Sequence, residues 1–249
     1  MSGDDALTPP LALPEQDALE LLACGDIVIE GRVVGSSNAT FYCAVSHNGV
    51  QAACVYKPVR GERPLWDFPD GTLAEREAAA YAVSAATGWD LIPPTVLRDG
   101  PLGAGMVQLW VEADSSVDLG ELIYRRDEPA LERIAVLDAV INNADRKGGH
   151  LLPTQGGRIY GIDHGLTFNE AEKLRTVLWQ WAGDPLDEGA VDVLAELLAA
   201  ISGSLGEALS ELLSGREIRR TQRRIQRLLN GATHPNPPRD RRAMPWPPF

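Results

Sequence analysis

The chain has 249 residues, of which 44% are hydrophobic, and its 35 acidic side chains outnumber 23 basic ones to give a formal net charge of −12. This length and hydrophobic content are sufficient for a buried core, which excludes an intrinsically disordered chain. The negative charge argues against a nucleic-acid-binding surface, so we expect no nucleic-acid partner.

The first residues that suggest structure predict a helix and a group of strands. A helix is expected over 15–23, because Pro14 stands at its start and Gly25 follows it as a stop signal. Three β-rich runs come next, at 26–34, 39–45 and 51–58. The Asn48-Gly49 pair between the last two runs is typical of a tight hairpin turn. The pattern predicts an antiparallel meander of three strands.

The middle of the chain continues the β-rich pattern around one further helix. Thr72 and Glu75 form a capping-box pattern that opens a helix over 73–87, and Gly88 closes it. Two more strand-like runs follow, at 95–100 and 103–112. Beyond residue 115 the pattern is mostly helical, apart from a short strand with an acidic turn in RIYGIDHG, residues 158–165.

The C-terminal part contains a basic helix and a proline-rich tail. The helix carries six arginines, Arg216, Arg219, Arg220, Arg223, Arg224 and Arg227, which we interpret as a solvated face. The prolines after residue 233 prevent helix formation, and Trp246 and Phe249 are expected to dock the tail on the surface.

The cysteines and the opening residues predict the compartment. Cys24, Cys43 and Cys54 are odd in number, far apart and surrounded by apolar residues, as expected of reduced core thiols. The opening sequence MSGDDALTPPLALPE is acidic and lacks the basic start of a signal peptide, and no apolar run has membrane-spanning length. We therefore expect a cytoplasmic protein without stable membrane insertion, and the sequence leaves its oligomeric state open.

Four features together resemble the protein-kinase-like superfamily. They are Lys57 on the third strand, a glutamate on the following helix, Asp145 with Lys147 in one turn, and Asp163 with Gly165 in YGIDHGLTF. The chain is similar to the atypical branch of phosphatidylinositol 3- and 4-kinases, HipA-type kinases and secreted casein kinases, and to a small phosphatidylinositol-kinase-like family of actinobacteria. The resemblance covers roughly residues 26–168, and its motifs are specific only in combination.

The resemblance implies an α+β fold with two lobes, a β-rich N-lobe carrying one helix and a mainly helical C-lobe. The predicted parts are a flexible tail (1–14), the N-lobe (15–113), the C-lobe (114–232) and a proline-rich tail (233–249). From Gly165 the chain reaches helical sequence near Glu172, so little room is expected for a long activation segment or for its regulation by phosphorylation.

The third strand would supply the nucleotide-binding lysine. Val55 and Lys57 alternate onto one face, where Val55 could cover a purine and Lys57 could reach the α- and β-phosphates. Glu75 and Glu77 compete to hold this lysine, and we choose Glu77 because Glu75 already belongs to the capping box. The alternatives are an edge lysine that extends to solvent and a solvent-facing glutamate.

Two further segments are candidates for contacts with ATP. Ser36, Ser37 and Asn38 lie between the first two strands, where kinases place a phosphate-covering loop, although an ordinary hairpin turn explains them about as well. Trp110 and Val111 fit the hinge between the lobes and could offer backbone groups to adenine; a connecting strand without ligand contacts would look the same.

The stretch DAVINNADRKGGHLL, residues 138–152, matches the position of a kinase catalytic loop. The resemblance implies that Asp145 orients the nucleophile and that Lys147 neutralises charge on the transferred phosphoryl group. Gly148 and Gly149 would let the backbone approach the phosphates closely. His150 stands where the family has a metal-binding asparagine, which is the main departure from the pattern.

Asp163 matches the metal-binding aspartate that follows a short strand, and His164 replaces the phenylalanine of the usual motif. With His150 and Asp163 as ligands, the metal could be Mg²⁺ or Mn²⁺. The sequence therefore predicts a metal-dependent ATP phosphotransferase that acts on a hydroxyl of an unidentified small-molecule, lipid or protein substrate. A nucleotide-binding pseudokinase and a nucleotidyl transferase on the same fold are the alternatives.

Overall fold

The computed structural model describes residues 13–249, so the predicted flexible tail lies almost wholly outside the described residues. The chain divides into two compact units. The first unit contains the chain up to Ala78 together with Pro93–Val111, and the second contains Ala79–Ile92 together with Glu112–Phe249. The units are therefore interleaved along the sequence, and each is described below by itself.

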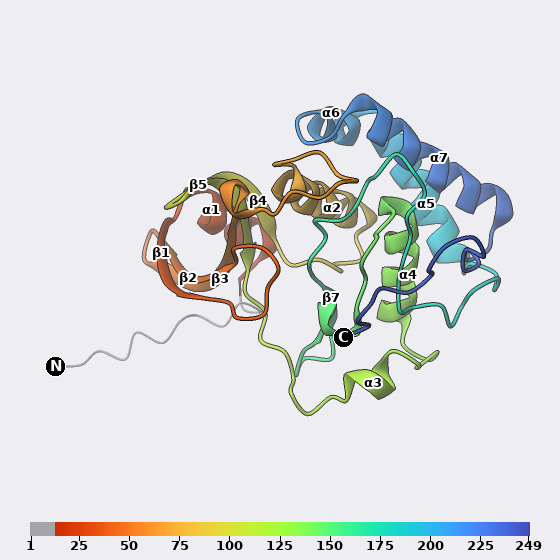
Figure 1. Cartoon of the computed structure of the whole chain (residues 1–249), viewed down its shortest axis with the longest axis horizontal. Coiled ribbons are helices and arrows are strands. Elements are labelled where there is room, and N and C mark those ends of the chain that lie inside the picture. The colour runs from red at the N-terminus through yellow and green to blue at the C-terminus, as the bar shows by residue number, and fades with distance from the viewer. Residues whose placement is uncertain (1–12) are drawn as a thin grey trace. The chain divides into compact units, whose positions relative to one another are not determined.

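The first unit is an antiparallel sheet of five strands in the order β1-β2-β3-β5-β4 (Figure 1). The strands are β1 (Asp26–Arg32), β2 (Phe41–His47), β3 (Val50–Pro58), β4 (Thr95–Gly100) and β5 (Gly103–Leu109). Asn48 and Gly49 join β2 to β3, and both have positive φ angles, 49° and 81°. Two such residues form the tight turn whose twist matches that of the strands, as the sequence predicts.

One face of this sheet packs against α1 (Glu15–Cys24) (Figure 1). Leu21 and Leu22 of the helix lie in a core cluster with Cys54 and Tyr56 of β3 and with Leu109. The opposite face of β3 therefore carries the alternate residues, which include the predicted nucleotide-binding lysine. Arg98 of β4 closes the end of α1 by donating to the carbonyl oxygens of Leu22 (2.9 Å) and Gly25 (2.8 Å).

Helix α2 (Leu73–Thr87) begins in the first unit and continues in the second, and its bounds are those expected from the sequence. It follows a short 3-10 turn, η2 (Val59–Gly61), and an irregular segment. The N–H groups of Leu73 and Ala74 donate to the carboxylate of Glu62 at 3.1 and 2.9 Å. A carboxylate from outside the helix thus binds its N-terminal donors, which the local capping pattern does not predict.

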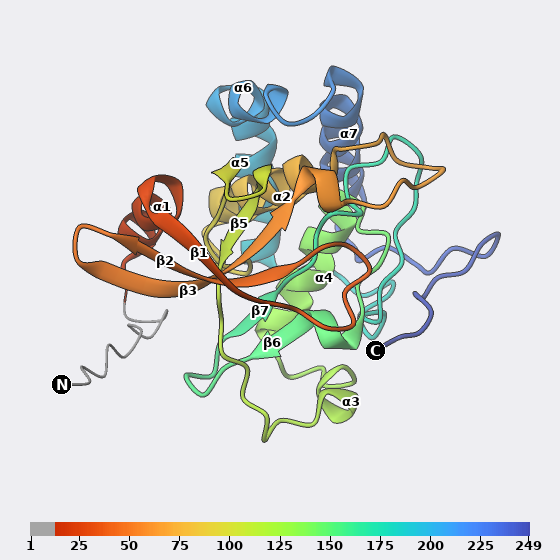
Figure 2. The ribbon, with the colours of Figure 1, turned by 60° about the vertical axis from the view of Figure 1, so that its left-hand side comes forward.

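The second unit is mainly helical (Figure 2). Its elements after α2 are α3 (Leu119–Leu122), α4 (Pro129–Ile141), η3 (Gly148–His150), β6 (Leu151–Pro153), β7 (Ile159–Gly161), α5 (Glu188–Ile201), α6 (Ser204–Ser210) and α7 (Gly215–Gly231). Helices α4 and α5 both pack against α7, and β6 pairs with β7 in a two-stranded antiparallel sheet. Over residues 13–249 no single helix is long and apolar enough to cross a membrane; α5 and α6 pass that test only as a pair, with a 62° bend between them.

The predicted fold class, α+β with a β-rich N-terminal half and a mainly helical C-terminal half, is confirmed. The helix expected near Glu172 is wrong, because the chain after β7 has no helix before α5 begins at Glu188. Its backbone is bound elsewhere: the N–H of Lys173 donates to the side chain of Asn142 at 2.8 Å. The segment between β7 and α5 therefore spans residues 162–187 and is longer than the sequence suggested.

Three smaller expectations meet mixed outcomes. Cys43 and Cys54 are buried opposite each other on β2 and β3, but Cys24 is exposed. Arg224, expected on a solvated face, is only 3% exposed, and burial lowers the pKa of its guanidinium. The C-terminal tail has no helix, as expected; Trp246 is 77% exposed, and Phe249, although 52% exposed, lies with its ring against Gly148.

Candidate active site

The first unit carries an ion pair on the sheet face opposite α1. Lys57 on β3 lies next to Val55 on the same face, and its Nζ is 2.6 Å from Oε1 of Glu77 on α2. The Glu77 side chain is 3% exposed and that of Lys57 21%, so the carboxylate is buried while the ammonium reaches the surface. The lysine is thus paired with Glu77, the glutamate expected from the sequence. A lysine held in this way keeps its charge at a fixed place.

Aromatic side chains lie beside this lysine on the same face of the sheet. Tyr42 is directly opposite Val55 in the β2–β3 register, and the Trp110 ring meets the Tyr42 ring edge-on with centroids 4.9 Å apart. The backbone N–H of Trp110 donates to the carbonyl oxygen of Ala53 at 3.0 Å. This backbone N–H therefore extends the pairing of the sheet and is not available to adenine. Val111, the next residue, is buried.

The loop between β1 and β2 is tied to the segment after β3. Ser36 Oγ lies 2.7 Å from Thr40 Oγ1, and the Asn38 side chain accepts a hydrogen bond from the N–H of Arg63 at 2.9 Å. Ser37 is exposed. The three predicted phosphate-contacting residues are thus held in one loop of the first unit, and two of them have internal partners.

The second unit carries its own group of candidate residues, which begins where α4 ends, at two asparagines. Asn142 has φ 56° and ψ 49°, the left-handed conformation that usually requires glycine at a helix end and that asparagine also tolerates. Its side chain donates to the carbonyl oxygens of Asn169 and Ala171 (3.0 and 2.7 Å) and accepts from Lys173 N–H. Asn142 therefore both ends the helix and fixes the segment that follows β7.

The next asparagine shapes the loop itself. The Asn143 side chain donates to Asp138 at 2.9 Å and accepts from the N–H of Asp145 at 3.0 Å. The carbonyl oxygen of Asn143 accepts from the N–H of Arg175 at 2.9 Å. Hydrogen bonds to the Asn143 carbonyl oxygen and from the Asp145 N–H thus fix the backbone on which Asp145 follows α4.

A fully buried ion pair lies beneath the loop. Arg146 and Asp138 are both 0% exposed, and the guanidinium donates to the two carboxylate oxygens at 2.9 to 3.2 Å. It also donates to the carbonyl oxygen of Ile162 at 2.9 Å, and its NH2 group lies 2.6 Å from Nε2 of His164. Because a guanidinium can only donate, this Nε2 accepts, which fixes the imidazole tautomer. Gly161 leaves room for the guanidinium, which would lie 3.2 to 3.4 Å from a Cβ there.

Asp145 and Lys147 point away from this buried pair. Lys147 Nζ lies 3.4 Å from Asp145 Oδ2, and both side chains are about a quarter exposed (23% and 27%). Burial raises the pKa of the Asp145 carboxyl; Lys147 opposes this effect and the charge of Asp163 adds to it. Asp145 is therefore a carboxylate whose affinity for a proton exceeds the ordinary value, as a group that accepts a proton from a hydroxyl requires.

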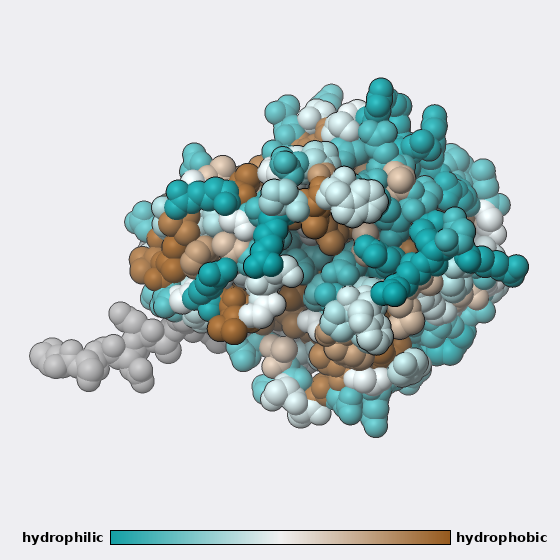
Figure 3. Space-filling view, viewed as in Figure 1, coloured by the Kyte–Doolittle hydropathy of each residue, from teal (hydrophilic) through white to brown (hydrophobic). Residues whose placement is uncertain are grey.

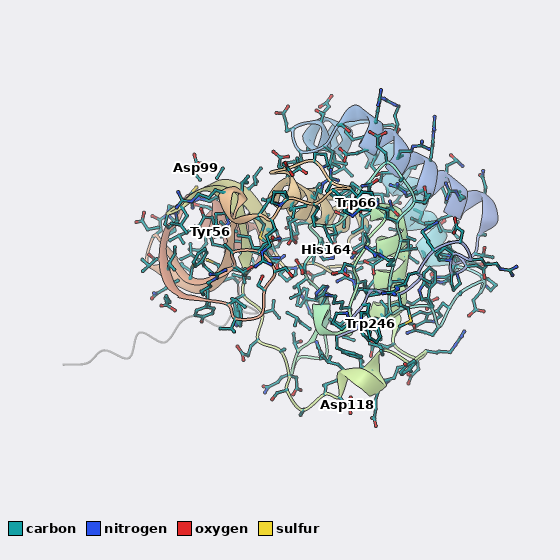
Figure 4. The ribbon with its side chains drawn as sticks, viewed as in Figure 1. Tyr56, Trp66, Asp99, Asp118, His164 and Trp246 are labelled. Atoms are coloured by element: carbon teal, nitrogen blue, oxygen red, sulfur yellow. The ribbon has the colours of Figure 1, made fainter. Side chains whose placement is uncertain are left out.

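Asp163, after β7, and His150, at the end of η3, form a second pair of charged or ionisable side chains. His150 Nε2 lies 3.4 Å from Asp163 Oδ2, and the Asp163 side chain is 50% exposed. Asp163 has φ 60°, a left-handed backbone conformation that is uncommon for residues other than glycine and that aspartate tolerates better than most. It follows β7 directly, and His164 beside it is buried (Figure 4).

Glycine is required at position 148 by a packing contact that the sequence did not reveal. A Cβ at this position would overlap the ring of Phe249, and the Gly148 N–H donates to the carbonyl oxygen of Pro248 at 2.8 Å. The C-terminal segment is further held by Trp179, whose indole N–H donates to Ala243 O at 3.1 Å. Gly148 thus makes room for the C-terminal segment, whereas Gly149 has open space around it.

The side chains of Asp163 and His150 fit a divalent cation whose remaining coordination positions are filled by a bound ligand. Over the described residues 13–249, no group of three or more histidine, cysteine or acidic side chains is arranged to hold a metal. Asp163 and His150 supply one carboxylate and one imidazole from two neighbouring segments, with side chains that are 50% and 15% exposed. Mg²⁺ is commonly bound by one or two carboxylates together with substrate phosphates, so the pair fits a metal that arrives with a nucleotide.

The structure thus brings Lys57 and Glu77 together in the first unit, and Asp145, Lys147, His150 and Asp163 together in the second. Sequence reasoning missed the residues that position this second group, above all Asp138 and Arg146. A signal was present, because an aspartate stands in an otherwise apolar stretch of α4 and buried carboxylates require a partner.

The fold and the site define a class: an α+β protein with a lysine–glutamate pair on its sheet and a loop of charged residues held by buried polar groups in its helical unit. The chain is 43% identical to protein Rv2133c of Mycobacterium tuberculosis over 267 aligned residues, covering 94% of this chain and 96% of that protein. The chain belongs to the same family as Rv2133c.

Two other proteins are similar to this chain over part of its length or at low identity. Phosphatidylinositol 4-kinase gamma 4 of Oryza sativa subsp. japonica is 30% identical over 131 residues, which cover 45% of this chain and 22% of that protein. The crystal structure of the Helicobacter pylori proinflammatory kinase CtkA matches with a TM-score of 0.47 and 11% sequence identity, covering 83% of this chain and 92% of that chain. No protein-family model matches the sequence.

Proposed function

We propose that the protein is a metal-dependent ATP phosphotransferase of the atypical kinase type that acts on a hydroxyl group. The observation that carries the proposal is the convergence of Asp145 and Asp163. They come from different loops, yet Asp163 lies close enough to raise the pKa of Asp145. Two carboxylates of unlike environment, each with a basic neighbour, are what phosphoryl transfer needs for orienting a nucleophile and for holding a cation.

Each residue has a role that follows from its surroundings. Asp145 would accept a hydrogen bond from the acceptor hydroxyl and take up its proton as the hydroxyl oxygen bonds to the γ-phosphorus of ATP, while the bond from that phosphorus to the bridging oxygen breaks and ADP leaves. Lys147, 3.4 Å from that carboxylate, would stand next to the transferred group and neutralise its charge. Lys57, fixed by the buried Glu77, would bind the α- and β-phosphates.

The metal would be held by Asp163 and His150. When bound, it neutralises charge on the phosphate oxygens. The rice relative of this chain is a phosphatidylinositol 4-kinase by name, which supports a phosphotransferase and leaves the acceptor open. The net charge of −12 favours a soluble acceptor over a substrate in an anionic membrane.

ATP turnover tests the proposal. The protein is incubated with γ-labelled ATP, Mg²⁺ or Mn²⁺ and a cell extract, and the labelled products are separated by chromatography. We expect ADP and a labelled acceptor from the wild type, and a loss of about 100-fold or more in the Asp145→Asn variant. Asp192→Asn, which changes an exposed aspartate of α5, is the control and should keep full turnover.

Two outcomes of this assay would replace the proposal. Release of pyrophosphate instead of ADP would favour the nucleotidyl transferase. Nucleotide binding without turnover, whichever metal is present, would favour the pseudokinase. The sequence feature that supports the pseudokinase is His150, which replaces a metal-binding asparagine of the family.

A further inference from the structure

Helix α7 carries a row of arginines on its exposed side. Arg216, Arg219, Arg220 and Arg223 are spaced by three, one and three residues, which places them on one face of a helix. All four side chains are exposed. The surface over α6 and α7 is strongly hydrophilic in Figure 3.

These four arginines line a pocket of about 300 Å³, together with Glu170. Within residues 13–249, no ion pair joins any of the four to a carboxylate, although the chain has 35 acidic residues. The carboxylate of Glu172 nearby is bound instead by Arg224 and Arg227, at 3.4 and 3.5 Å. Like charges three and four residues apart destabilise a helix, so this arrangement of arginines is unfavourable for the stability of α7.

The beginning of α7 adds to the positive potential. Arg216 and Arg219 lie in its first two turns, where the helix dipole is positive. Ser214 and Glu217 form a reciprocal capping box that fixes this end of the helix. A rigid helix with guanidinium groups along one face is suited to bind anions through paired N–H donors.

The geometry points to a ligand with more than one phosphate group. Seven residues of helix rise by about 10 Å, so the four arginines are spread along the pocket and can bind phosphate groups at separate places. The pocket volume of about 300 Å³ is at the small end of ligand pockets, which favours a compact anion. We propose that this arginine pocket binds a soluble small molecule carrying two or more phosphate groups, and this proposal does not depend on the phosphotransferase activity.

One wall of the pocket is formed by Glu170, which lies in a segment that is hydrogen-bonded to the end of α4. Glu170 lies between Asn169 and Ala171, whose carbonyl oxygens both accept hydrogen bonds from Asn142 at the end of α4. The guanidinium of Arg224 donates to the same Asn169 oxygen. A ligand in the pocket would therefore contact a segment that is hydrogen-bonded to the start of that loop.

Calorimetric titration with inositol hexakisphosphate and with inorganic tripolyphosphate tests the proposal. The wild type should bind both probes, and Arg219→Gln with Arg220→Gln should weaken binding about 100-fold, since a hydrogen bond to a charged group is worth about a factor of ten or more. Arg239→Gln with Arg242→Gln removes the same charge from exposed positions of the C-terminal tail and should leave binding within about twofold. The thermal unfolding of each variant without ligand shows that it is folded.

A second variant gives a result of the opposite sign. Glu170→Gln removes the one negative charge of the pocket and should tighten binding of both probes. The proposal is overturned if the wild type binds neither probe, or if both double variants lose binding equally. It is also overturned if the protein sediments with vesicles containing phosphatidylinositol 4-phosphate while soluble phosphates fail to bind, because the ligand would then be a membrane surface.

Discussion

At the scale of single residues, the raised pKa of Asp145 suits its proposed function but lowers the stability of the folded chain at neutral pH. Its carboxyl is partly buried, and burial raises its pKa more than the neighbouring Lys147 lowers it. In the unfolded chain the same group has its ordinary pKa of about 4. Between these two values the folded state binds more protons than the unfolded state, so this contribution to stability falls as the pH rises through that window.

Replacing this aspartate by asparagine removes the titration and keeps the shape. We expect Asp145→Asn to be more stable than the wild type at neutral pH, with the difference in unfolding free energy shrinking as the pH falls toward about 4. Urea unfolding at several pH values between about 4 and 7 measures this difference. A variant that is less stable at neutral pH, or a difference that does not change with pH, would contradict the raised pKa.

The buried pair beneath the loop predicts a large loss of stability. Asp138→Ala leaves the guanidinium of Arg146 without its carboxylate at a position that is 0% exposed. Breaking such a pair costs about 3–5 kcal/mol of unfolding free energy. Asp127→Ala breaks an exposed pair with Arg125 and should leave the unfolding free energy nearly unchanged. Equal losses in the two variants would show that the buried pair does not support the loop.

At the level of elements, the segment between β7 and α5 is held by a side chain of another element. Asn142 at the end of α4 binds the backbone at Asn169, Ala171 and Lys173. This explains why the segment is ordered without helix or strand, since its polar backbone groups have partners. It also gives the loop with Asp145 and the turn after Asp163 a shared support.

Asn142→Gly tests this support without disturbing the left-handed backbone. Glycine adopts φ 56° at no cost but lacks the amide, so the N–H of Lys173 loses its acceptor. We expect faster hydrogen exchange at residues 169–175 in the variant. Asn48→Gly, at the hairpin turn with φ 49°, is the matched control and should leave these amides unchanged. Unchanged exchange in both variants would mean that Asn142 does not fix the segment.

The elements also show where sequence reasoning succeeds and where it fails. Helix α2 and the turn at Asn48 and Gly49 follow local rules, so their bounds are predictable from residues in sequence order. The helix end at Asn142, the cap from Glu62 and the contact of Phe249 with Gly148 depend on residues that are distant in the chain. The charged site residues could be selected by type and spacing, but the buried Arg146 that positions them required the structure.

For the whole molecule, the proposed function predicts that a residue of each unit contributes separately to the binding of ATP with a metal. Lys57 is fixed by Glu77 in the first unit, and Asp163 lies with His150 in the second. If Lys57 binds phosphates and Asp163 holds the metal, each is needed for binding ATP with metal, although neither is needed to fold the unit that carries the other.

Calorimetric titration of ATP with Mg²⁺ or Mn²⁺ into the wild type, Lys57→Ala and Asp163→Ala is the most direct measurement. Asp192→Ala, at an exposed position of α5, is the control. We expect each of the first two variants to bind ATP with metal at least about tenfold more weakly than the wild type, since each loses a charged contact to phosphate or metal. Binding of equal strength in all four proteins, or none in the wild type, would contradict the account.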